Sequence, residues 1–558
     1  VFVIRLFYLQ VIQHDHYVAL AAQEQLQKEV INAKRGEVYA LNGTKTPVKL
    51  VLNETVYTVY VDPATVGDAG KVTEVMKRIA GGNVVKNFEQ RLSVEGSRYQ
   101  IIATRVTRTQ AEKIKEADLS GVGFQAVSQR VYPEGRLGSQ LLGFVNADGK
   151  GNYGLEGYMN TQLSGVNGRL QTVTDVSNVP LTIGDQNIRE PAKDGTNVVM
   201  SIDRNIQSKV EEVSETYAKK FSAGNVSVLV MNPNNGQVMA MANYPDYDPA
   251  KYYEVTDGAL FNNHAISDPY EPGSDMKTYT MATAIDQGVA NANDTYNNVD
   301  TIKVEDRTIG NAQKGKTGII SFQTAMNWSL NTGFVTLGMR LGNGTQITEQ
   351  ARTTIYEYYH DRLGLGAVTG VELANESQGI VIPPTEVEGN AVRYSNMTFG
   401  QGLDATMIQV SAGLSAIING GSYYKPTVIA GEVVNGEYKP NSPAQPERSA
   451  VVKSTTSQQM REMIVATRQF TSPGRDKAGY SVGGKTGTSQ VIKNGEYAND
   501  ETVGTYLGFG GSADRPEYVI MVSVSGDKKE FSGAIHAAPL FTEISNWLID
   551  YLKLQPKG

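Results

Sequence analysis

The chain has 558 residues, of which 40% are hydrophobic and 20% charged, a composition that predicts roughly two to four globular domains and argues against a disordered or fibrous protein. A formal net charge of −7 argues against nucleic acid as the main partner, because phosphate binding needs a basic face. The absence of cysteine excludes disulfides, thiolate catalysis and cysteine-ligated metal.

The histidines offer no recognisable metal motif. There are five of them, and the one close pair, His14 and His16, has a spacing that fits neither a metalloprotease helix nor a zinc finger. We therefore expect no metal site.

The first segment, residues 1–34, opens with the apolar run Val1–Ile12, which is shorter than the about 20 residues that cross a bilayer. Because the sequence starts inside an apolar run and lacks an initiating methionine, we expect the end of a membrane anchor; a soluble helix end is the alternative. From Gln13 to about Val30, the polar, alanine- and glutamine-rich pattern predicts an exposed juxtamembrane helix.

The second segment, residues 35–194, alternates short β-rich runs with helical stretches, which predicts an α+β module without obvious chemistry. Residues 56–61 read as a strand, and residues 71–80 and 109–117 as helices. A new domain is expected to begin near Gly195.

The third segment, residues 195–558, begins with a predicted strand at 197–203 and an amphipathic helix at 206–222. Residues 226–231 and 237–242, joined through Asn234-Asn-Gly236, predict a β-hairpin. The further elements expected are helices at 321–341, 402–418 and 539–552, a hairpin or loop at 431–450, and strands at 502–510 and 518–525. Short connections between the strands predict a mostly antiparallel sheet.

Within this segment, Glu271-Pro-Gly-Ser274-Asp-Met-Lys277 precedes an apolar-periodic run that ends at Ile285. The Pro-Gly pair breaks the preceding structure, so Ser274 is expected in the first helical turn with Lys277 one turn later on the same face. A lysine of lowered pKa can take the proton of a serine hydroxyl, which makes the pair a candidate nucleophile and base. Taken alone, the pair is better explained as a capping serine beside a solvated lysine.

Two later stretches supply the other parts of an acyl-transfer site. Ser329-Leu-Asn331 offers a second hydroxyl and a carboxamide, and Lys485-Thr486-Gly487-Thr488 offers a cation, a flexible glycine and hydroxyls. Ser-x-x-Lys, Ser-x-Asn and Lys-Thr-Gly in this order resemble the motif set of penicillin-binding proteins and serine β-lactamases.

Three glycine-rich stretches imitate nucleotide sites. Residues 310–317 and 479–486 have P-loop spacing, and residues 149–154 resemble a dinucleotide turn. Neither P-loop-like stretch has a buried strand before it and a helix after it, and no βαβ repeat surrounds the third. We therefore do not expect a nucleotide to bind.

The resemblance extends over nearly the whole chain. Residues 130–137, 142–149 and 154–156 resemble the segments that join the amino-terminal module to the catalytic domain in class B, monofunctional penicillin-binding proteins, and residues 399–402 and 419–421 also match family segments. Residues 264–274 resemble the division-type branch most closely. Ala40 and Leu41 depart from the family, which usually has Asp and Arg there, in the non-catalytic module.

This resemblance implies an α+β fold: a penicillin-binding or serine β-lactamase-like transpeptidase domain, with helices on an antiparallel sheet, at 195–558, preceded by an elongated dimerisation or pedestal domain at 35–194. It implies that Ser274 attacks the D-Ala-D-Ala carbonyl while Lys277 accepts its proton, with the backbone amides of Ser274 and Thr488 as the oxyanion hole. The other implied roles are proton relay for Ser329, orientation for Asn331, positive field for Lys485, and substrate binding for Thr486, Gly487 and Thr488. No metal or organic cofactor is needed.

The implied function is crosslinking of peptidoglycan stem peptides through acyl-Ser274, blocked covalently by β-lactams, in septal wall synthesis. The implied partners are the stem peptides, a membrane glycosyltransferase and division proteins, with a single-pass anchor in the bacterial cell membrane and the catalytic domain on its extracytoplasmic side. Two alternatives stay open: a D,D-carboxypeptidase or β-lactamase that hydrolyses its acyl-enzyme, and a non-catalytic penicillin-binding sensor or scaffold.

Overall fold

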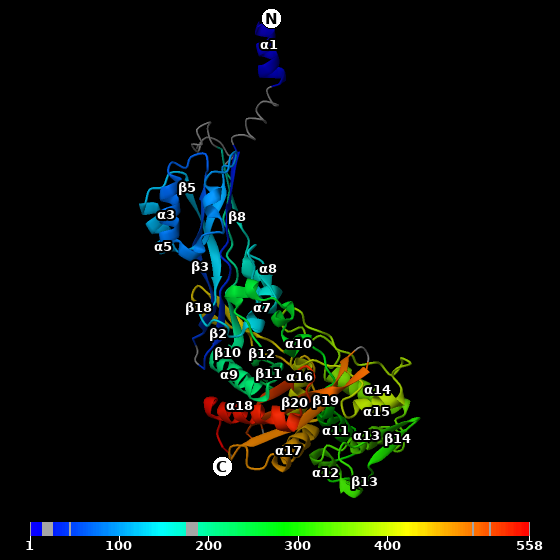
Figure 1. Ribbon diagram of the computed structural model, residues 1–558. Coiled ribbons are helices and arrows are strands. Elements are labelled where there is room, and N and C mark those ends of the chain that lie inside the picture. The colour runs from blue at the N-terminus through cyan, green and yellow to red at the C-terminus, as the bar shows by residue number, and fades with distance from the viewer. Residues whose placement is uncertain are drawn as a thin grey trace. The chain divides into compact units, whose positions relative to one another are not determined.

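The structure is a computed structural model that describes residues 2–13, 26–43, 46–173, 188–493, 496–512 and 515–556 (Figure 1). The chain forms two compact units that alternate along the sequence. The amino-terminal unit comprises residues 1–38, 49–133 and 161–197, and the carboxy-terminal unit comprises residues 39–48, 134–160 and 198–558.

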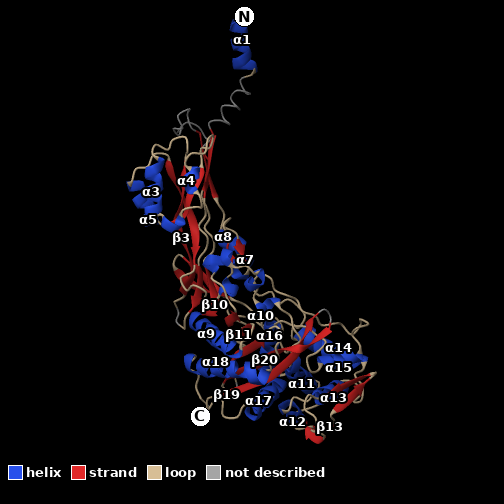
Figure 2. Ribbon diagram, in the orientation of Figure 1, coloured by secondary structure: helices blue, strands red, loops and turns tan. Residues whose placement is uncertain are grey.

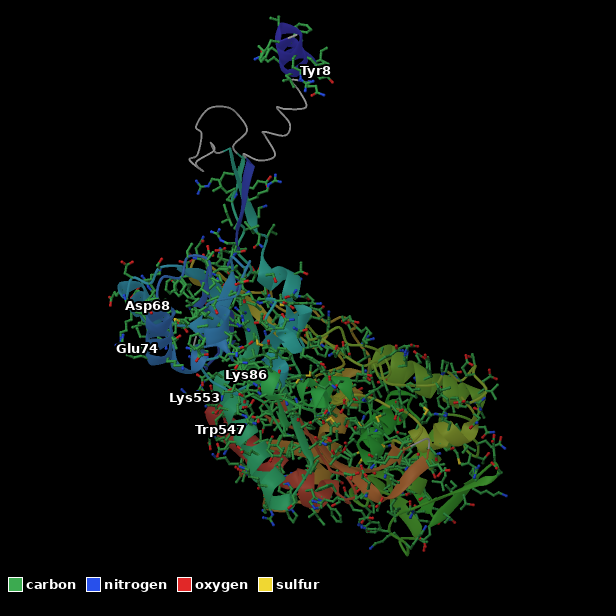
Figure 3. All side chains as sticks on the ribbon, turned by 45° about the horizontal axis from the view of Figure 1, so that its top comes forward. Tyr8, Asp68, Glu74, Lys86, Trp547 and Lys553 are labelled. Carbon is green, nitrogen blue, oxygen red and sulfur yellow. The ribbon has the colours of Figure 1, made fainter. Side chains whose placement is uncertain are left out.

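The amino-terminal unit is built around the long strand β3 (Val48–Val61), which pairs antiparallel with β4 (Gln100–Val106) and β5 (Val122–Val131). Helices α3 (Ala69–Ile79) and α5 (Arg108–Glu116) bury their apolar faces against this sheet in one core. The side chain of Asp68 caps α3 by accepting a hydrogen bond from the amide of Lys71 (Figure 3). The predicted strand and both predicted helices of this segment are therefore confirmed.

The first segment differs from its prediction. A helical stretch covers α1 (Phe2–Phe7) and the π-helical residues Tyr8–Ile12, whereas His14 and His16 lie outside the described residues. Leu26–Ile31 is a strand, β1, paired antiparallel with β8 (Gly168–Val173), so the helix expected as far as Val30 is wrong there. Pairing with a strand more than a hundred residues away outweighs the weak helical propensity of this mixed polar stretch.

No helix within the described ranges is both long and apolar enough to cross a membrane.

The carboxy-terminal unit contains a five-stranded sheet in the order β12-β11-β21-β20-β19, and the pairing is antiparallel throughout, as predicted. Its strands are β11 (Asn225–Met231), β12 (Val238–Tyr244), β19 (Ser481–Lys493), β20 (Glu496–Gly511) and β21 (Pro516–Ser525). Helices α9 (Arg204–Phe221) and α18 (Ala538–Tyr551) share one hydrophobic core with the sheet (Figure 2). Helix α16 (Met407–Ile418) also packs on β11 and β21. Strand β19 ends the sheet.

The nucleophile candidate lies at the start of a buried helix. A 3₁₀ turn, η5 (Gly273–Met276), runs directly into α11 (Lys277–Asp286), and every residue of α11 is buried. The predicted break at the Pro-Gly pair is confirmed, with Gly273 in the left-handed region at φ 57°.

The helix expected at 321–341 is interrupted. It forms α12 (Phe322–Asn327) and α13 (Asn331–Arg340), and Ser329 lies between them at φ 55°. The amides of Ser329 and Leu330 donate to the carbonyls of Met326 and Ala325 at 3.1 and 2.9 Å, which is the Schellman pattern that ends a helix. Glycine usually takes the left-handed position of this motif, so a serine there does not signal the break.

The helix expected at 402–418 starts later, at Met407, because Asp404 and Ala405 form extended bridges with Ile380 and Tyr270. The hairpin expected within 431–450 is confirmed in β17 (Ile429–Val434) and β18 (Glu437–Pro440). The remaining elements of this unit include β10 (Val198–Asp203), β13 (Thr295–Asn298), β14 (Thr301–Val304), β15 (Arg307–Gly310), β16 (Gly318–Ser321), α14 (Glu349–Tyr356), α15 (Ala391–Met397) and α17 (Ser454–Thr471).

Candidate active site

The Lys277 amine is the centre of the predicted site. Its Nζ lies 2.9 Å from Ser274 Oγ, one helical turn earlier, as the spacing predicts. It also lies 3.0 Å from Ser329 Oγ, 2.7 Å from the Ser329 carbonyl oxygen and 2.8 Å from Asn331 Oδ1. Ser329 and Asn331, which follow Lys277 by 52 and 54 residues in sequence, thus meet it at one nitrogen.

Burial shapes the chemistry of this amine. The side chain of Lys277 is 0% exposed, and desolvation lowers its pKa well below the usual range of lysine, with a further lowering from the charge of Lys485. A neutral amine at hydrogen-bond distance from Ser274 Oγ is able to accept the proton of that hydroxyl.

Ser329 connects the two lysines of the site. Its hydroxyl lies 3.0 Å from Lys277 Nζ and 2.9 Å from Lys485 Nζ. The helix break described above places this hydroxyl at the junction of α12 and α13, where it faces both amines. A hydroxyl both donates and accepts, so it is able to pass a proton from one side to the other.

Asn331 begins α13 and is held at both ends of its side-chain amide. Its Oδ1 accepts from Lys277 Nζ, and its Nδ2 donates to the carbonyl of Gly310 at 3.0 Å. Gly310 belongs to one of the P-loop-like stretches; it ends β15, and strand β16 rather than a helix follows. No local sequence pattern predicts that this segment lies against the site, where it fixes the orientation of Asn331.

Lys485 reaches the site from strand β19 and is 3% exposed. Burial lowers its pKa to about 8, against the raising effect of the negative charge on Asp275. Because Gly484 and Lys485 lie inside a paired strand, the second P-loop-like stretch forms no phosphate loop.

The remaining predicted residues follow Lys485 on the same strand. Thr486 Oγ1 lies 3.5 Å from Lys485 Nζ, and Thr488 Oγ1 accepts a hydrogen bond from the amide of Gly533 at 3.2 Å. A β-carbon on Gly273 would lie 2.9 Å from the carbonyl oxygen of Thr488, so the backbone that leads into Ser274 packs directly on Thr488. Among the residues whose positions the structure gives, one edge of β19 pairs with no other strand, and an edge of this kind is able to pair with an extended peptide.

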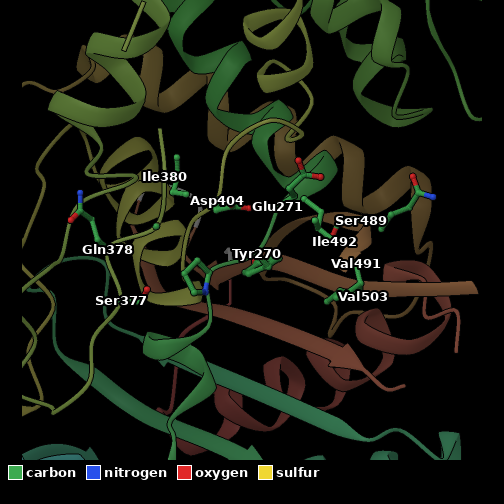
Figure 4. Close-up of a pocket in the computed structure, with 13 residues that line it drawn as sticks. Tyr270, Glu271, Ser377, Gln378, Ile380, Asp404, Ser489, Val491, Ile492 and Val503 are labelled. Atoms are coloured by element: carbon green, nitrogen blue, oxygen red, sulfur yellow. The ribbon is translucent and has the colours of Figure 1, made fainter. Parts of the chain in front are cut away.

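The segment 399–402 holds the loop in front of Ser274. The amide of Gly273 donates to the carbonyl of Gly400 at 3.0 Å, and the amide of Gly402 donates to Glu271 Oε1 at 2.6 Å. A cleft of about 640 Å³ opens here, lined by Tyr270, Glu271, Asp404, Ser489 and Val503 among others (Figure 4). Glu271 lies three residues before Ser274, and Ser489 directly follows Thr488. The cleft therefore adjoins the site.

No cluster of three or more His, Cys, Asp or Glu side chains suited to a metal ion occurs among the residues for which the structure gives a position.

Comparison with known families matches two parts of the chain. Residues 226–546 match the family described as the penicillin binding protein transpeptidase domain, and residues 30–200 match the penicillin-binding protein dimerisation domain.

Individual proteins are similar over most of the chain. Stage V sporulation protein D of Bacillus subtilis is 30% identical over 566 residues, which cover 99% of this chain and 84% of that protein. The probable peptidoglycan D,D-transpeptidase FtsI of Caulobacter vibrioides is 28% identical over 465 residues, 82% of this chain and 69% of its own length. The crystal structure of penicillin binding protein 3 from Mycobacterium tuberculosis with aztreonam has a TM-score of 0.70 at 25% identity and covers 95% of this chain and 98% of its own.

Proposed function

We propose that this chain, which belongs to the division-type, class B penicillin-binding proteins, crosslinks peptidoglycan stem peptides by acyl transfer through Ser274. The observation that carries the proposal is the contact of 2.9 Å between Ser274 Oγ and the fully buried Lys277 Nζ. A nucleophile beside a base of lowered pKa is the basic requirement of serine acyl transfer.

In the first half-reaction, Ser274 Oγ attacks the carbonyl carbon between the two terminal D-alanines, and its proton moves to Lys277 Nζ. The bond from this carbon to the nitrogen of the last D-alanine then breaks. Ser329, which contacts Lys277 Nζ at 3.0 Å, relays the proton to the leaving amine. The products are an ester on Ser274 and free D-alanine.

Strand β19 and the start of η5 bind the substrate and stabilise the negative charge that develops on the attacked carbonyl oxygen. The amides of Ser274 and Thr488 form the oxyanion hole, and losing one such donor costs roughly 3 to 4 kcal/mol of transition-state stabilisation. Because Thr488 Oγ1 accepts its hydrogen bond from Gly533, its own proton is free to donate to the terminal carboxylate of the stem peptide. Thr486 and the charge of Lys485 act on the same carboxylate, and the unpaired edge of β19 aligns the peptide beyond Gly487.

In the second half-reaction, an amine from a neighbouring stem peptide attacks the ester carbonyl and yields the crosslink. Lys277, in its neutral form, takes the proton of this amine as Ser274 leaves. A β-lactam resembles the D-Ala-D-Ala end, acylates Ser274 in the same way and blocks the second half-reaction.

The proposed setting is the septal wall, with residues 195–558 holding the transpeptidase site, residues 35–194 serving as a pedestal or dimerisation domain, and residues 1–34 containing the end of a membrane anchor. A separate membrane glycosyltransferase would supply the glycan strands, together with division proteins. The relative named as a stage V sporulation protein favours sporulation as a second candidate setting.

Intact-mass measurement with penicillin tests the acyl-serine site. The wild-type protein is expected to gain the mass of one antibiotic, and Ser274→Ala, with unchanged circular dichroism, is expected to gain none. Labelling of folded Ser274→Ala would refute the assignment. A D-Ala-D-Ala peptide with and without an acceptor amine then separates the remaining readings. Crosslinked product supports the transpeptidase, and transfer of the acyl group to water alone, which yields the peptide shortened by one D-alanine, supports the hydrolase. Acylation by the antibiotic without either reaction supports the sensor.

A further inference from the structure

A buried carboxylate lies between the nucleophile and the base in the sequence. Asp275, which directly follows Ser274 in η5, is 0% exposed. Its Oδ2 accepts a hydrogen bond from Thr505 Oγ1 at 2.7 Å, whereas no hydrogen-bond partner lies near its buried Oδ1 among the residues with described positions. Burying a half-satisfied carboxylate is costly, so a compensating charge or a function is expected there.

This carboxylate lies against the face of β19 from which Lys485 projects. Gly487 follows Lys485 by two residues, so the two share a face of the strand. A β-carbon on Gly487 would come within 2.8 Å of Asp275 Oδ2 and 2.2 Å of Thr505 Oγ1. Thr505 is also the register partner of Gly487 across β19 and β20.

Two buried amines compete for one positive charge in this site. Lys277 Nζ and Lys485 Nζ lie 3.0 and 2.9 Å from the same oxygen, Ser329 Oγ, so two ammonium groups there would repel each other strongly. The charge of Asp275 raises the pKa of Lys485 against the effect of burial. Burial raises the pKa of Asp275 itself to about 7, against the lowering effects of the hydrogen bond from Thr505 and of the charge of Lys485. Burial and the charge of Lys485 both lower the pKa of Lys277.

The charge of Asp275 also acts on the phenols of Tyr270, Tyr279 and Tyr506 and raises their pKa values, although burial is the larger cause for each. These phenols stay neutral over the pH range of the assay, so Lys485 is the cation that balances the charge of this carboxylate.

We propose that Asp275 is a positioning residue whose carboxylate assigns the single positive charge of the site to Lys485 and so leaves Lys277 neutral, as the base toward Ser274. The inference rests on the proposed acyl transfer at Ser274. Asp275, which occupies a variable position of the Ser-x-x-Lys motif, thus gives the two lysines different charge states.

The decisive variant is Asp275→Asn, which keeps the shape of the side chain and an oxygen that accepts from Thr505 but removes the charge. The quantity to measure is the second-order rate constant of acylation by a fluorescent penicillin, as a function of pH. In the wild type this rate is expected to fall on the alkaline side as Lys485 loses its proton, since burial lowers the pKa of Lys485 to about 8. Without the neighbouring anion the ammonium form of Lys485 is less stable. The fall of the rate at high pH, the alkaline limb of the profile, is therefore expected about 1 to 3 pH units lower in Asp275→Asn.

Asp286→Asn is the matched control. Asp286 ends the same helix, is 4% exposed, and accepts hydrogen bonds from Thr456 Oγ1 at 2.8 Å and from the amide of Lys453 at 2.6 Å. Its substitution removes a buried carboxylate far along the helix from the serine, so it is expected to lower the melting temperature and leave the alkaline limb in place.

An alkaline limb of folded Asp275→Asn that coincides with the wild type would overturn the proposal and reduce Asp275 to a packing contact. Should Asp275→Asn fail to fold, ¹⁵Nζ-lysine NMR of the wild type decides instead. The signal lost in Lys485→Met is expected at an ammonium position and that of Lys277 at a neutral amine position; the reverse, or two neutral amines, overturns the proposal. Failure of the proposed function looks different, because then penicillin would not acylate Ser274 at any pH.

Discussion

Gly487→Ala tests how closely the start of η5 and strand β19 are packed. A β-carbon at this position would lie 2.2 Å from Thr505 Oγ1, 2.8 Å from Asp275 Oδ2 and 2.9 Å from the carbonyl oxygen of Pro272. All three atoms are oxygens, and neither the short side chains nor the backbone carbonyl can swing away. The conflict is therefore relieved only if β19 and η5 separate.

The expected size of the effect follows from this separation. Overpacking of this kind costs about 1 to 3 kcal/mol of unfolding free energy. A displacement of about 1 Å in catalytic groups costs about 100-fold in rate, and Lys485 and the Thr488 amide would move with the strand. We expect a small loss of stability and a much larger loss of acylation.

Thermal unfolding and the rate of penicillin acylation measure the two effects. Gly258→Ala is the control, because a β-carbon on Gly258 meets nothing within 4 Å. Both quantities are expected to stay at wild-type values in the control. Unchanged stability together with unchanged acylation in Gly487→Ala would refute the close packing on which the site geometry depends. A loss of stability with unchanged acylation would show that β19 adjusts without moving its catalytic groups.

Three further outcomes are expected. Ser329→Gly suits the left-handed backbone at φ 55°, so its melting temperature should hold while acylation falls about 10²- to 10⁴-fold; a wild-type rate would remove the hydroxyl from the proton path. Acylation by the wild type should decline as pH rises through about 8, because Lys485 loses its charge there, and a continued rise above that pH would contradict its role. Arg468→Ala strands Asp476, which lies 2.8 Å from the fully buried guanidinium, and should cost about 3 to 5 kcal/mol in urea unfolding without changing acylation by the folded protein. A cost below about 1 kcal/mol would mean that water replaces the guanidinium.

Local sequence signals predicted the elements that depend on neighbouring residues. The hairpin of β11 and β12 follows from alternation and the Asn-Gly turn, and the contact between Ser274 and Lys277 follows from the helical spacing after a Pro-Gly break. The roles assigned to these side chains in the reaction stay predictions.

Elements set by distant partners escaped prediction. Leu26–Ile31 is a strand because β8 pairs with it, and Ser329 ends a helix although nothing in its own identity favours φ 55°. Asp275 looked like an ordinary residue of a helical turn. Its contact with Thr505 depends on the register of β19 against β20, which no local pattern contains.

The meeting of Lys277, Ser329 and Lys485 at shared hydrogen bonds has a consequence for folding. Ser329 is separated from Lys277 by 52 residues and from Lys485 by 156, so these contacts close only after most of the unit has reached its final topology. A partly folded chain with α11 in place but β19 undocked would lack both the proton relay and one oxyanion donor. The fraction of molecules that a penicillin labels therefore counts correctly folded protein, and the time course of labelling after dilution from denaturant would report the docking of this last strand.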